Sequence, residues 1–349
     1  MIDADPLVYS DLAERLKGEA LRLGFDKVGI ARADAPEDFG HYLDWLARGD
    51  HAGLGYMEKN ASARENPSSI LEGVRSVVMV SLVHGRSRPE NQPLNSAKIA
   101  AYAQGADYHA VLWGKLNALL AWIKIEKPEV RGRGVSDTAP LLERDFARRA
   151  GLGWIGKNTL LIDTKLGSFT MLGALLLDLE LTADAPFEKG HCGTCTRCLD
   201  ACPTDAFRAP YQLDARKCLS YWTIEHKDDL SDEMAEALGD WVFGCDVCQE
   251  VCPWNRKAKA SSEPLLASRE EWSSPDLLEW LRADPADFSA RLKGTALSRT
   301  KRRGLIRNAL HILGNRREKA AEADVGRLLD DPEPVIRRAA AWALRRIKG

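Results

Sequence analysis

The eight cysteines are the residues with the clearest chemistry, because all of them lie between Cys192 and Cys252. The first run is Cys192-x2-Cys195-x2-Cys198-x3-Cys202-Pro203, and the second is Cys245-x2-Cys248-x3-Cys252-Pro253, with Cys218 between the two. In bacterial ferredoxins the spacing of the first run supplies three thiolates to one [4Fe–4S] cluster and the fourth thiolate to its neighbour. The sequence therefore predicts two [4Fe–4S] clusters.

The similarity of the two runs suggests, as a hypothesis, which cysteines share a cluster. One cluster takes Cys192, Cys195, Cys198 and Cys252, and the other takes Cys218, Cys245, Cys248 and Cys202. Cys-x2-Cys is also a zinc spacing, so a pair of zinc sites is the alternative, although the two x3-Cys-Pro endings favour clusters. Two adjacent clusters are typical of single-electron transfer, so the electrons need a destination elsewhere in the chain.

Composition and length bound the kind of protein. The chain has 349 residues, 45% hydrophobic and 29% charged, which suits two or three globular domains. No apolar run approaches the roughly 20 residues that span a bilayer, and the acidic, amphipathic start is unlike a signal peptide. Disulfides would be dispersed through the chain rather than gathered in one segment. We expect a cytoplasmic protein that does not enter the membrane.

The elements that would position the cysteines fall into three regions. Residues 1–180 are expected to form an α/β domain, 181–257 a ferredoxin-like double-cluster domain, and 265–349 a helical domain. In the first region we predict helices over 12–23, 109–125 and 140–150, strands over 27–31 and 76–82, and an apolar segment over 169–177. In the third we predict helices over 302–313, 320–329 and 334–347, and the last resembles a HEAT-type repeat.

Nucleotide-binding motifs are absent from the α/β region. There is no Gly-x-Gly-x-x-Gly turn after a strand and no Gly-x-x-x-x-Gly-Lys-Ser/Thr loop, so neither a nicotinamide nor a nucleoside triphosphate is indicated. Another cofactor is expected to receive the electrons. The segments that stand out instead are 135–144, containing Asp137-Thr-Ala-Pro-Leu-Leu-Glu143-Arg144, and 151–161, containing Gly156-Lys157-Asn158.

An ordered set of motifs follows these two segments along the chain: Leu166-Gly-Ser168-Phe, the double cysteine run with Ser220-Tyr-Trp-Thr-Ile-Glu225 inside it, and Cys252-Pro-Trp-Asn255. Together the motifs resemble the epoxyqueuosine reductase family, and the resemblance covers nearly the whole chain. The resemblance implies a cobalamin in the α/β region, fed by the two clusters. It also implies reduction of the epoxide of epoxyqueuosine, at the wobble position of certain tRNAs, to the alkene of queuosine. The family is related to reductive dehalogenases.

The mode of cobalamin binding is also implied by the resemblance. Asp107-Tyr-His109 begins like the Asp-x-His-x-x-Gly cobalamin motif, but Leu112 stands where that motif needs glycine. We therefore expect a base-off corrinoid held without a histidine motif. Candidate contacts to it are Tyr102, Tyr108, His109, Gly156, Lys157, Asn158, Ser168 and Ser220. For each of these residues, core packing or a plain structural turn is the alternative.

Asp137 matches the position of the family's proton donor. An epoxide oxygen that leaves as water must be protonated, and a carboxylic acid can do this if burial raises its pKa. The alternative is structural: Asp followed by Thr and Pro is a common helix start, so Asp137 could cap the helix predicted near Pro140. The family context favours catalysis.

The C-terminal region is the basic part of the chain. Residues 299–349 carry 14 Lys/Arg and 6 Asp/Glu, about +8, whereas the net charge of the whole chain is −2. Such a surface suits the phosphates of tRNA. The predicted contacts are Arg299, Lys301, Arg302, Arg303 and Arg307, with Trp222 as a stacking partner for the target base. The alternative is that these cations merely solvate the outer helix faces.

Three other functions compete with this hypothesis. A nucleic-acid repair protein with a structural cluster usually needs only one cluster, whereas two imply electron flow. A non-catalytic electron-transfer subunit would bind no corrinoid, and a reductive dehalogenase would act on a small organohalide and would generally be exported. The reductase hypothesis expects a low-potential electron donor, tRNA as the partner and a monomeric chain.

Overall fold

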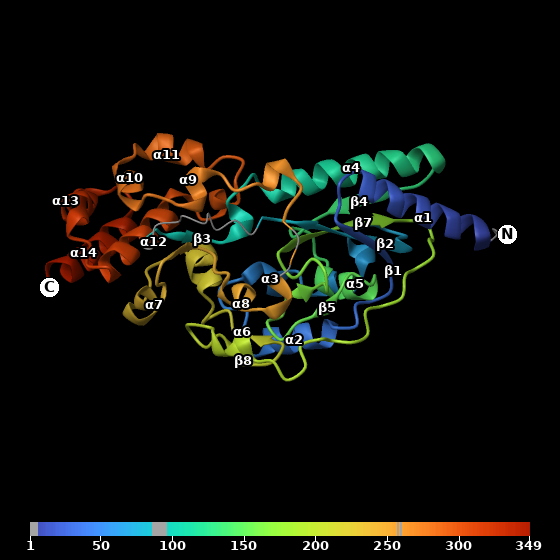
Figure 1. The fold of residues 1–349 in the computed structure, drawn as a ribbon, viewed down its shortest axis with the longest axis horizontal. Helices are drawn as coiled ribbons and strands as arrows, with labels where there is room; N and C mark the ends of the chain where they lie inside the picture. Colours follow the sequence, from blue (N-terminus) through green and yellow to red (C-terminus); the bar gives the residue numbers. More distant parts are fainter. Residues whose placement is uncertain (1–5, 86–95, 257, 259) are drawn as a thin grey trace.

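The computed structural model describes residues 6–85, 96–256, 258 and 260–349. Figure 1 shows three groups of elements: a sheet with helices near the N-terminus, the helical tail at the opposite end, and the cysteine-bearing segment below and between them. None of the helices in this described part of the chain is long and apolar enough to cross a bilayer.

A four-stranded sheet is the frame of the first region. Its order is β1 (Lys27–Arg32), β2 (Ser76–Val83), β7 (Thr170–Leu177) and β4 (Gly132–Val135), and all neighbours are antiparallel. All eight residues of β2 are buried, so the strand predicted over 76–82 lies in the interior of the sheet. The antiparallel pairing was not predicted, because the alternation of helix and strand along the chain does not fix strand direction.

Helices cover both faces of this sheet. Alternate residues of a strand point to opposite faces, so Val78 and Val80 of β2 pack with α1 (Pro6–Arg22) and α4 (Tyr108–Glu126). Val77 and Met79 instead share a core with Phe146 of α5 (Glu143–Arg149). Burial on both faces explains why β2 reads as a continuous apolar run rather than an alternating one.

The start of α5 differs from the prediction. This helix begins at Glu143, three residues after Pro140, and its N-terminal flanking residue Leu142 makes no side-chain cap. Asp137 lies outside the helix with a positive φ of 60°. The helix-capping alternative for Asp137 is therefore wrong.

Four further short elements belong to this region. They are α2 (Phe39–Ala47), α3 (Gly55–Lys59), β5 (Trp154–Ile155) and β6 (Leu161–Ile162). β5 and β6 form an antiparallel pair, and the tight turn between them contains Gly156, Lys157 and Asn158.

The cysteine segment is built from short elements that repeat. α6 (Arg197–Asp200) carries Cys198 and α8 (Val247–Glu250) carries Cys248, and the two helices lie against each other. Between them come the hairpin of β8 (Phe207–Ala209) and β9 (Gln212–Leu213), a π-helical turn over Tyr221–Glu225, and α7 (Asp232–Ala237). β10 (Trp241–Phe243) pairs in parallel with β3 (Lys98–Ile99), joining this segment to the first region.

The tail is helical, as predicted, although α13 is shorter than the predicted 320–329. Its helices are α9 (Glu270–Ser273), α10 (Leu277–Arg282), α11 (Pro285–Arg291), α12 (Lys301–Asn315), α13 (Glu322–Arg327) and α14 (Pro334–Lys348). α12 packs along α14, and α12 is central to the largest core.

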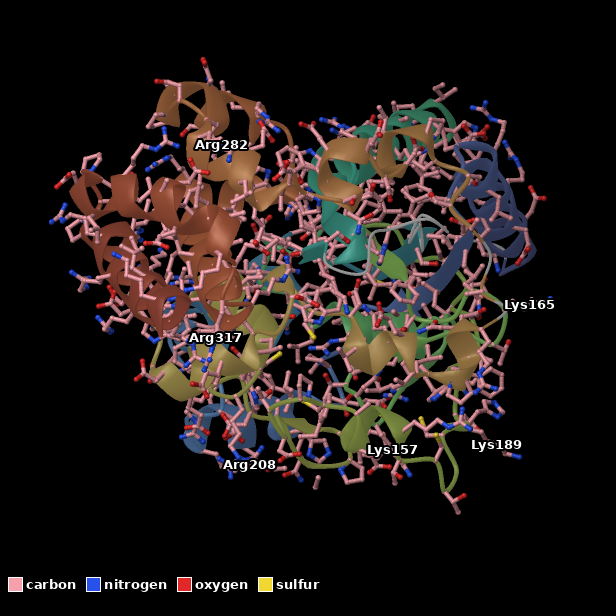
Figure 2. All side chains as sticks on the ribbon, turned by 60° about the vertical axis from the view of Figure 1, so that its left-hand side comes forward. Lys157, Lys165, Lys189, Arg208, Arg282 and Arg317 are labelled. Atoms are coloured by element: carbon pink, nitrogen blue, oxygen red, sulfur yellow. The ribbon has the colours of Figure 1, made fainter. Side chains whose placement is uncertain are left out.

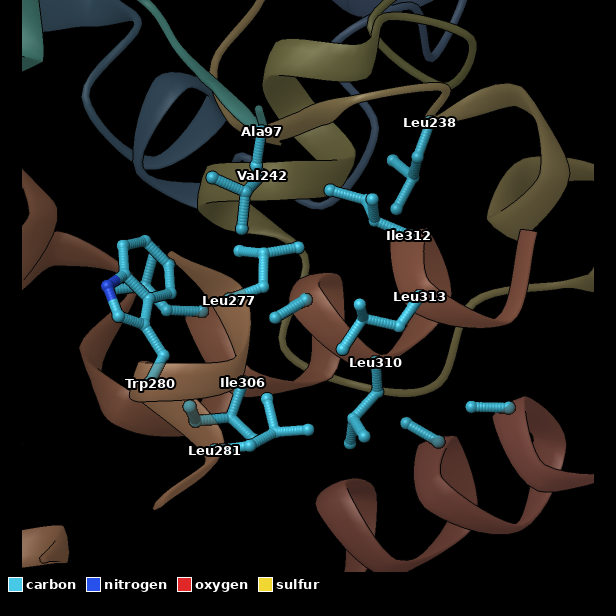
Figure 3. Close-up of a cluster of buried hydrophobic side chains, with 14 of the residues drawn as sticks. Ala97, Leu238, Val242, Leu277, Trp280, Leu281, Ile306, Leu310, Ile312 and Leu313 are labelled. Carbon is cyan, nitrogen blue, oxygen red and sulfur yellow. The ribbon is translucent and has the colours of Figure 1, made fainter. Parts of the chain in front are cut away.

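That core also takes residues from outside the tail. Figure 3 shows Ala97, Leu238 and Val242 packed with Leu277, Trp280 and the α12 residues Ile306, Leu310, Ile312 and Leu313. One hydrophobic core therefore joins residues 97–103, 219–243 and the tail. The domain limits 1–180, 181–257 and 265–349 stay a prediction, and this core crosses both boundaries, because it contains residues of all three predicted domains.

Candidate active site

Asp137 lies where the end of β4 meets the start of α4. Its Oδ2 accepts a hydrogen bond from the Tyr108 hydroxyl at 2.9 Å and lies 3.5 Å from His109 Nε2. His109 Nδ1 in turn lies 2.8 Å from Asp107 Oδ1, and Asp107 caps α4 by accepting from the His109 backbone N–H. The helix start therefore fixes a chain of carboxylate, imidazole and carboxylate.

The protonation of this chain differs from the sequence prediction. The contact with His109 lowers the pKa of Asp137 below its usual value and outweighs burial, while the Tyr108 hydroxyl adds to the lowering. Burial opposes protonation of His109, but Asp137 and Asp107 together raise the pKa of its ring above 6.5. The prediction that burial would raise the pKa of Asp137 is wrong, because a cationic neighbour stabilises the carboxylate. The transferable proton is held mainly by His109.

Glu143 supports the loop that carries Asp137. Its Oε1 accepts the Asp137 backbone N–H at 2.7 Å, which holds Asp137 in its left-handed conformation. Burial raises the pKa of Glu143 to about 8, and the charge of Asp137 adds to the rise. Glu143 is therefore a mostly neutral carboxylic acid at pH 7.

Solvent reaches this site although protein surrounds it. Asp137 exposes 65% of its side chain, yet desolvation still acts against its ionised form. Arg144 is likewise exposed, and desolvation lowers its pKa. We call the group formed by Asp137, Tyr108, His109, Glu143 and Arg144 the Asp137 site.

Aromatic rings extend from the Asp137 site into the core. Tyr102 packs edge-on against Tyr108 and His84, with ring centroids 5.9 and 6.4 Å away. Burial raises the pKa of Tyr102, and the charges of Asp137 and Asp246 add to the rise. Tyr102, Tyr108 and His109, three of the predicted corrin contacts, are thus brought together beside Asp137.

The cysteine thiols fall into two groups. Burial raises the pKa of Cys198 to about 11, and the neighbouring thiols of Cys192, Cys252 and Cys195 add to the rise. Burial likewise raises the pKa of Cys245 to about 12, with contributions from Cys218 and Cys202, and Cys248 is affected by Cys245 and Cys218. These neighbours agree with the two sets that the repeat predicts, although Cys198 of the first set also raises the pKa of Cys248, and the sets stay a prediction.

The spacing of these thiols fits clusters better than zinc. Four thiolates on one zinc ion, with Zn–S about 2.3 Å, must approach within about 4 Å of one another. In the described part of the chain, no three His, Cys, Asp or Glu side chains come together in a way that would hold a single ion. In a [4Fe–4S] cube each thiolate binds a different iron, so the thiolates stand further apart.

Lys157 and Asn158 contact the cysteine loops. Lys157 Nζ donates to the carbonyls of Gly193 and Cys195 at 2.7 and 3.0 Å, and Asn158 Nδ2 donates to the Cys248 carbonyl at 3.4 Å. Figure 2 shows Lys157 in the lower part of the molecule. The prediction of a cation directed at the corrin is corrected, because the ammonium group is used to hold a cysteine loop. A Cβ on Gly156 would lie 2.7 Å from Asn158 Oδ1, so glycine lets this turn close.

Ser168 and Ser220 also face the cysteine segment. Ser168 Oγ donates to Gln249 Oε1 and accepts from Asn255 Nδ2, both at 2.9 Å. Ser220 hydrogen-bonds the thiol of Cys218 through its backbone and side chain, which lowers the pKa of that thiol against the larger effect of burial. Both serines therefore act beside the predicted cluster ligands.

Two of the five predicted tRNA-binding cations of the tail, Arg302 and Arg307, are internal. Arg307 has no exposed surface and donates to the carbonyls of Trp222, His226 and Asp228 at 2.7–2.8 Å. Arg302 pairs with Asp331 at 2.6 Å and is 12% exposed. Arg303 is half-buried and Lys301 is exposed. The prediction that Arg307 and Arg302 contact tRNA is corrected, since both are needed inside the fold.

An acidic segment explains where much of the basic charge of the tail goes. Residues 225–240 contain seven Asp/Glu, and four of these pair with tail arginines. The pairs are Arg299–Glu225, Arg338–Asp229, Arg346–Glu236 and Arg316–Asp240, at 2.5–2.9 Å. The charge asymmetry read from the sequence is therefore partly an attraction between two segments of one chain.

Trp222 is less available than predicted. Its Nε1 donates to the Arg216 carbonyl at 2.7 Å, and its ring packs against His226 and partly against the tail core. Sequence reasoning gave no role to Tyr56, Glu143 or Glu225, all of which lie near Asp137 in the structure. Glu143 and Glu225 fall inside the motifs noted above, whereas nothing in the sequence distinguishes Tyr56.

Family models match two parts of the chain. Residues 191–255 match the 4Fe-4S double cluster binding domain, and residues 64–138, which end next to Asp137, match the family described as epoxyqueuosine reductase QueG, DUF1730. The prediction of two [4Fe–4S] clusters is confirmed.

An antiparallel α/β layer, a double-cluster segment and a carboxylate–imidazole site in one chain define an iron–sulfur oxidoreductase. Relatives named epoxyqueuosine reductase come from Cellulophaga algicola, 42% identical over 86% of this chain and 96% of the relative, and Xanthomonas campestris pv. campestris, 37% identical over 96% of each. The chain belongs to the epoxyqueuosine reductase family, as its sequence motifs predict.

A solved structure agrees with this assignment. The crystal structure of an epoxyqueuosine reductase with an epoxyqueuosine-modified tRNA-Tyr stem loop superposes with a TM-score of 0.91 and 31% identity, covering 97% of this chain and 91% of that one. A purely electron-transferring subunit is therefore the weaker hypothesis.

Proposed function

We propose that the protein reduces the epoxide of epoxyqueuosine, at wobble position 34 of tRNA, to the alkene of queuosine. The net reaction consumes two electrons and two protons, and the epoxide oxygen leaves as water. The observation that carries the proposal is the Asp107–His109–Asp137 chain next to a double-cluster segment, in a member of this family.

Asp137 is the proposed proton donor. In the structure Asp137 Oδ2 lies 3.5 Å from His109 Nε2, and the raised pKa of His109 together with the lowered pKa of Asp137 favours a proton on the imidazole. As negative charge develops on the epoxide oxygen, the His109 proton passes to Asp137 and from Asp137 to that oxygen, while Asp107 stabilises the imidazole. Solvent, which reaches Asp137, supplies the second proton with which the oxygen leaves as water. The Tyr108 hydroxyl keeps Asp137 Oδ2 oriented at 2.9 Å.

The two clusters deliver the electrons one at a time. The proposed ligands are Cys192, Cys195, Cys198 and Cys252 for one, and Cys202, Cys218, Cys245 and Cys248 for the other. The grouping of the thiols supports these sets, and the contact of α6 with α8 brings the two sets next to each other.

Cobalamin is the proposed electron acceptor. The Asp137 carboxylate is accessible to solvent beside the packed rings of Tyr102 and Tyr108, and these two residues and the backbone of the Gly156 turn are the proposed contacts. His109 is engaged by two carboxylates, which favours a corrinoid without a histidine ligand. When bound, cobalamin supplies a low-valent metal that can reduce the epoxide carbon.

The tail is proposed to act as a HEAT-like platform that receives the tRNA. The packing of α12 on α14 supports a stacked helix pair, and Lys301 and Arg299 are exposed at its edge. The stem loop in the related crystal structure supports tRNA as the substrate. A low-potential donor, a cytoplasmic location and a monomeric state stay predictions.

Complementation tests the proposed function in cells. A bacterial strain lacking its own epoxyqueuosine reductase should accumulate epoxyqueuosine in its tRNA, and expression of this chain should restore queuosine. A chain with Cys198→Ser and Cys248→Ser should not restore it. Persistence of epoxyqueuosine with the soluble wild-type chain present would contradict the proposal.

A further inference from the structure

Tyr56 is an exposed aromatic residue that the proposed chemistry does not use. It lies in the short helix α3, and 44% of its surface is exposed. The Arg299 guanidinium lies over its ring, 5.7 Å from the ring centroid. An aromatic face and a guanidinium plane are the two surfaces on which nucleic-acid bases stack.

Arg299 is held in a defined orientation. Its Nε and Nη2 donate to Glu225 Oε1 and Oε2, each at 2.9 Å. Arg299 is 57% exposed, whereas Glu225 is 20% exposed. A two-point pair of this kind fixes the plane of the guanidinium, so its outer face can receive a ligand without further ordering.

The three residues come from three separate parts of the chain. Tyr56 belongs to the α/β region, Glu225 ends the π-helical turn that follows Cys218, and Arg299 directly precedes α12. The Tyr221 hydroxyl accepts the Gly53 backbone N–H at 3.1 Å, which ties the approach to α3 to the same π-helical turn. The fold therefore brings these side chains to one place and holds them there.

This place is next to the proton donor. Burial raises the pKa of Tyr56 to about 12, and the charges of Glu225 and Asp137 add to the rise. Asp137 also acts on the pKa of Arg299. The Tyr56–Arg299 pair therefore lies within electrostatic reach of Asp137.

A purely structural role explains less of this arrangement. The Arg299–Glu225 pair could tie the tail to the π-helical turn, and a tether of this kind needs only the two charges. It gives no reason for an exposed tyrosine ring under the guanidinium, beside a carboxylate that must meet the substrate.

We propose that Tyr56 and Arg299, with Glu225 fixing the guanidinium, form a stacking site for the planar purine-like base that bears the epoxide-carrying substituent. The inference rests on the proposed function and adds the base-recognition residues to it. Tyr56 and Arg299 are binding residues, and Glu225 is a positioning residue.

Equilibrium binding of two anticodon stem loops tests the site without requiring turnover. The loops are identical except that one has a purine-type base at the wobble position and the other is abasic there. The wild-type holoenzyme should prefer the base-bearing loop by about 5- to 100-fold. Tyr56→Ala and Arg299→Lys should reduce that preference several-fold, whereas Tyr56→Phe should keep it. Affinity for the abasic loop should change little in all three variants.

Tyr211→Ala is the matched control, because Tyr211 is 52% exposed on the β8–β9 hairpin. It should keep the full preference, with iron content and melting temperature of every variant at wild-type values. A Tyr56→Ala variant that keeps the wild-type preference overturns the stacking site. If the complementation above succeeds while the wild-type protein shows no preference, the stacking site fails and the proposed function stands.

Discussion

The order of proton affinities around Asp137 determines how this site can work. Asp137 stays ionised beside protonated His109, because the imidazolium lowers the pKa of the carboxyl group. Asp137 can therefore donate a proton only after His109 has transferred its own proton to it. The sequence predicted Asp137 from its motif, but not this arrangement. The 3.5 Å contact depends on where β4 ends and α4 begins, which no local pattern specifies.

Asp137→Asn tests the donor role. The amide keeps the shape of the side chain but cannot deliver the proton, so turnover should fall about 100- to 10,000-fold. The measurement is the rate of queuosine formation by protein whose iron and corrinoid contents match those of the wild type. A rate within a few-fold of the wild type would remove Asp137 from the mechanism.

Glu143→Gln tests the neutral acid behind the loop. The folded-state pKa of Glu143 is about 8 against a usual 4.5. Between pH 4.5 and pH 8 the folded protein therefore binds more protons than the unfolded chain. The stability that the protonated carboxyl contributes is complete below about pH 4.5 and is lost as the pH rises through 8. Gln does not titrate, so the melting temperature of the variant minus that of the wild type should increase between about pH 5 and pH 8.5. Parallel curves for the two proteins would refute the neutral-acid assignment.

At the scale of elements, the long helices and strands could be predicted from apolar patterns, whereas the short connections between them could not. The helices α4, α12 and α14 and the strand β2 were predicted nearly correctly, because each has a sustained apolar pattern, whereas β7 was predicted only as an apolar segment. The start of α5 was predicted three residues early, since Pro140 is followed by a turn before the helix begins. Lys157 and Ser168 hydrogen-bond to residues of the cysteine segment that lie 36 and 81 positions further along the chain. The spacing of residues within a motif does not predict contacts over such separations.

The cysteine segment should hold two clusters. Anaerobically reconstituted protein should contain about eight iron and about eight sulfide per chain. Elemental analysis with a sulfide assay makes the measurement. A value of four, or zinc in place of iron, would contradict the two ligand sets.

α12 should hold the π-helical turn through Arg307. Arg307→Met leaves three partly buried carbonyls without their donors, at a cost of about 2–4 kcal/mol in unfolding free energy. Arg303→Met, on the same helix but half-buried, should cost about 0.5 kcal/mol. Chemical denaturation of both variants makes the comparison. Equal losses of unfolding free energy in the two variants would show that the Arg307 hydrogen bonds do not stabilise the fold.

For the whole molecule, charge is distributed between segments rather than collected in one patch. The tail arginines that the sequence marks as a basic surface partly neutralise residues 225–240. Their net charge could be counted from the sequence, but their partners could not, because each pair joins residues more than 70 positions apart. tRNA binding must therefore rely on the cations that stay exposed.

Lys301→Glu tests this view of the binding surface. Lys301 is exposed at the start of α12, so the substitution should weaken stem-loop binding and reduce the slope of log K against log salt by about one. Lys165→Glu is the control, because Figure 2 places Lys165 on the side of the molecule opposite the tail. An unchanged slope for Lys301→Glu would exclude this residue from the phosphate contacts.

The central claim is that one chain carries electrons from two clusters to an epoxide on a tRNA base. Its most direct test is anaerobic incubation of the purified protein with cobalamin, a low-potential reductant and tRNA containing epoxyqueuosine, followed by nucleoside mass spectrometry. We predict conversion of epoxyqueuosine to queuosine, with loss of one oxygen atom, only when cobalamin and reductant are both present. Unconverted epoxyqueuosine in the complete mixture, with both clusters intact, would contradict the account.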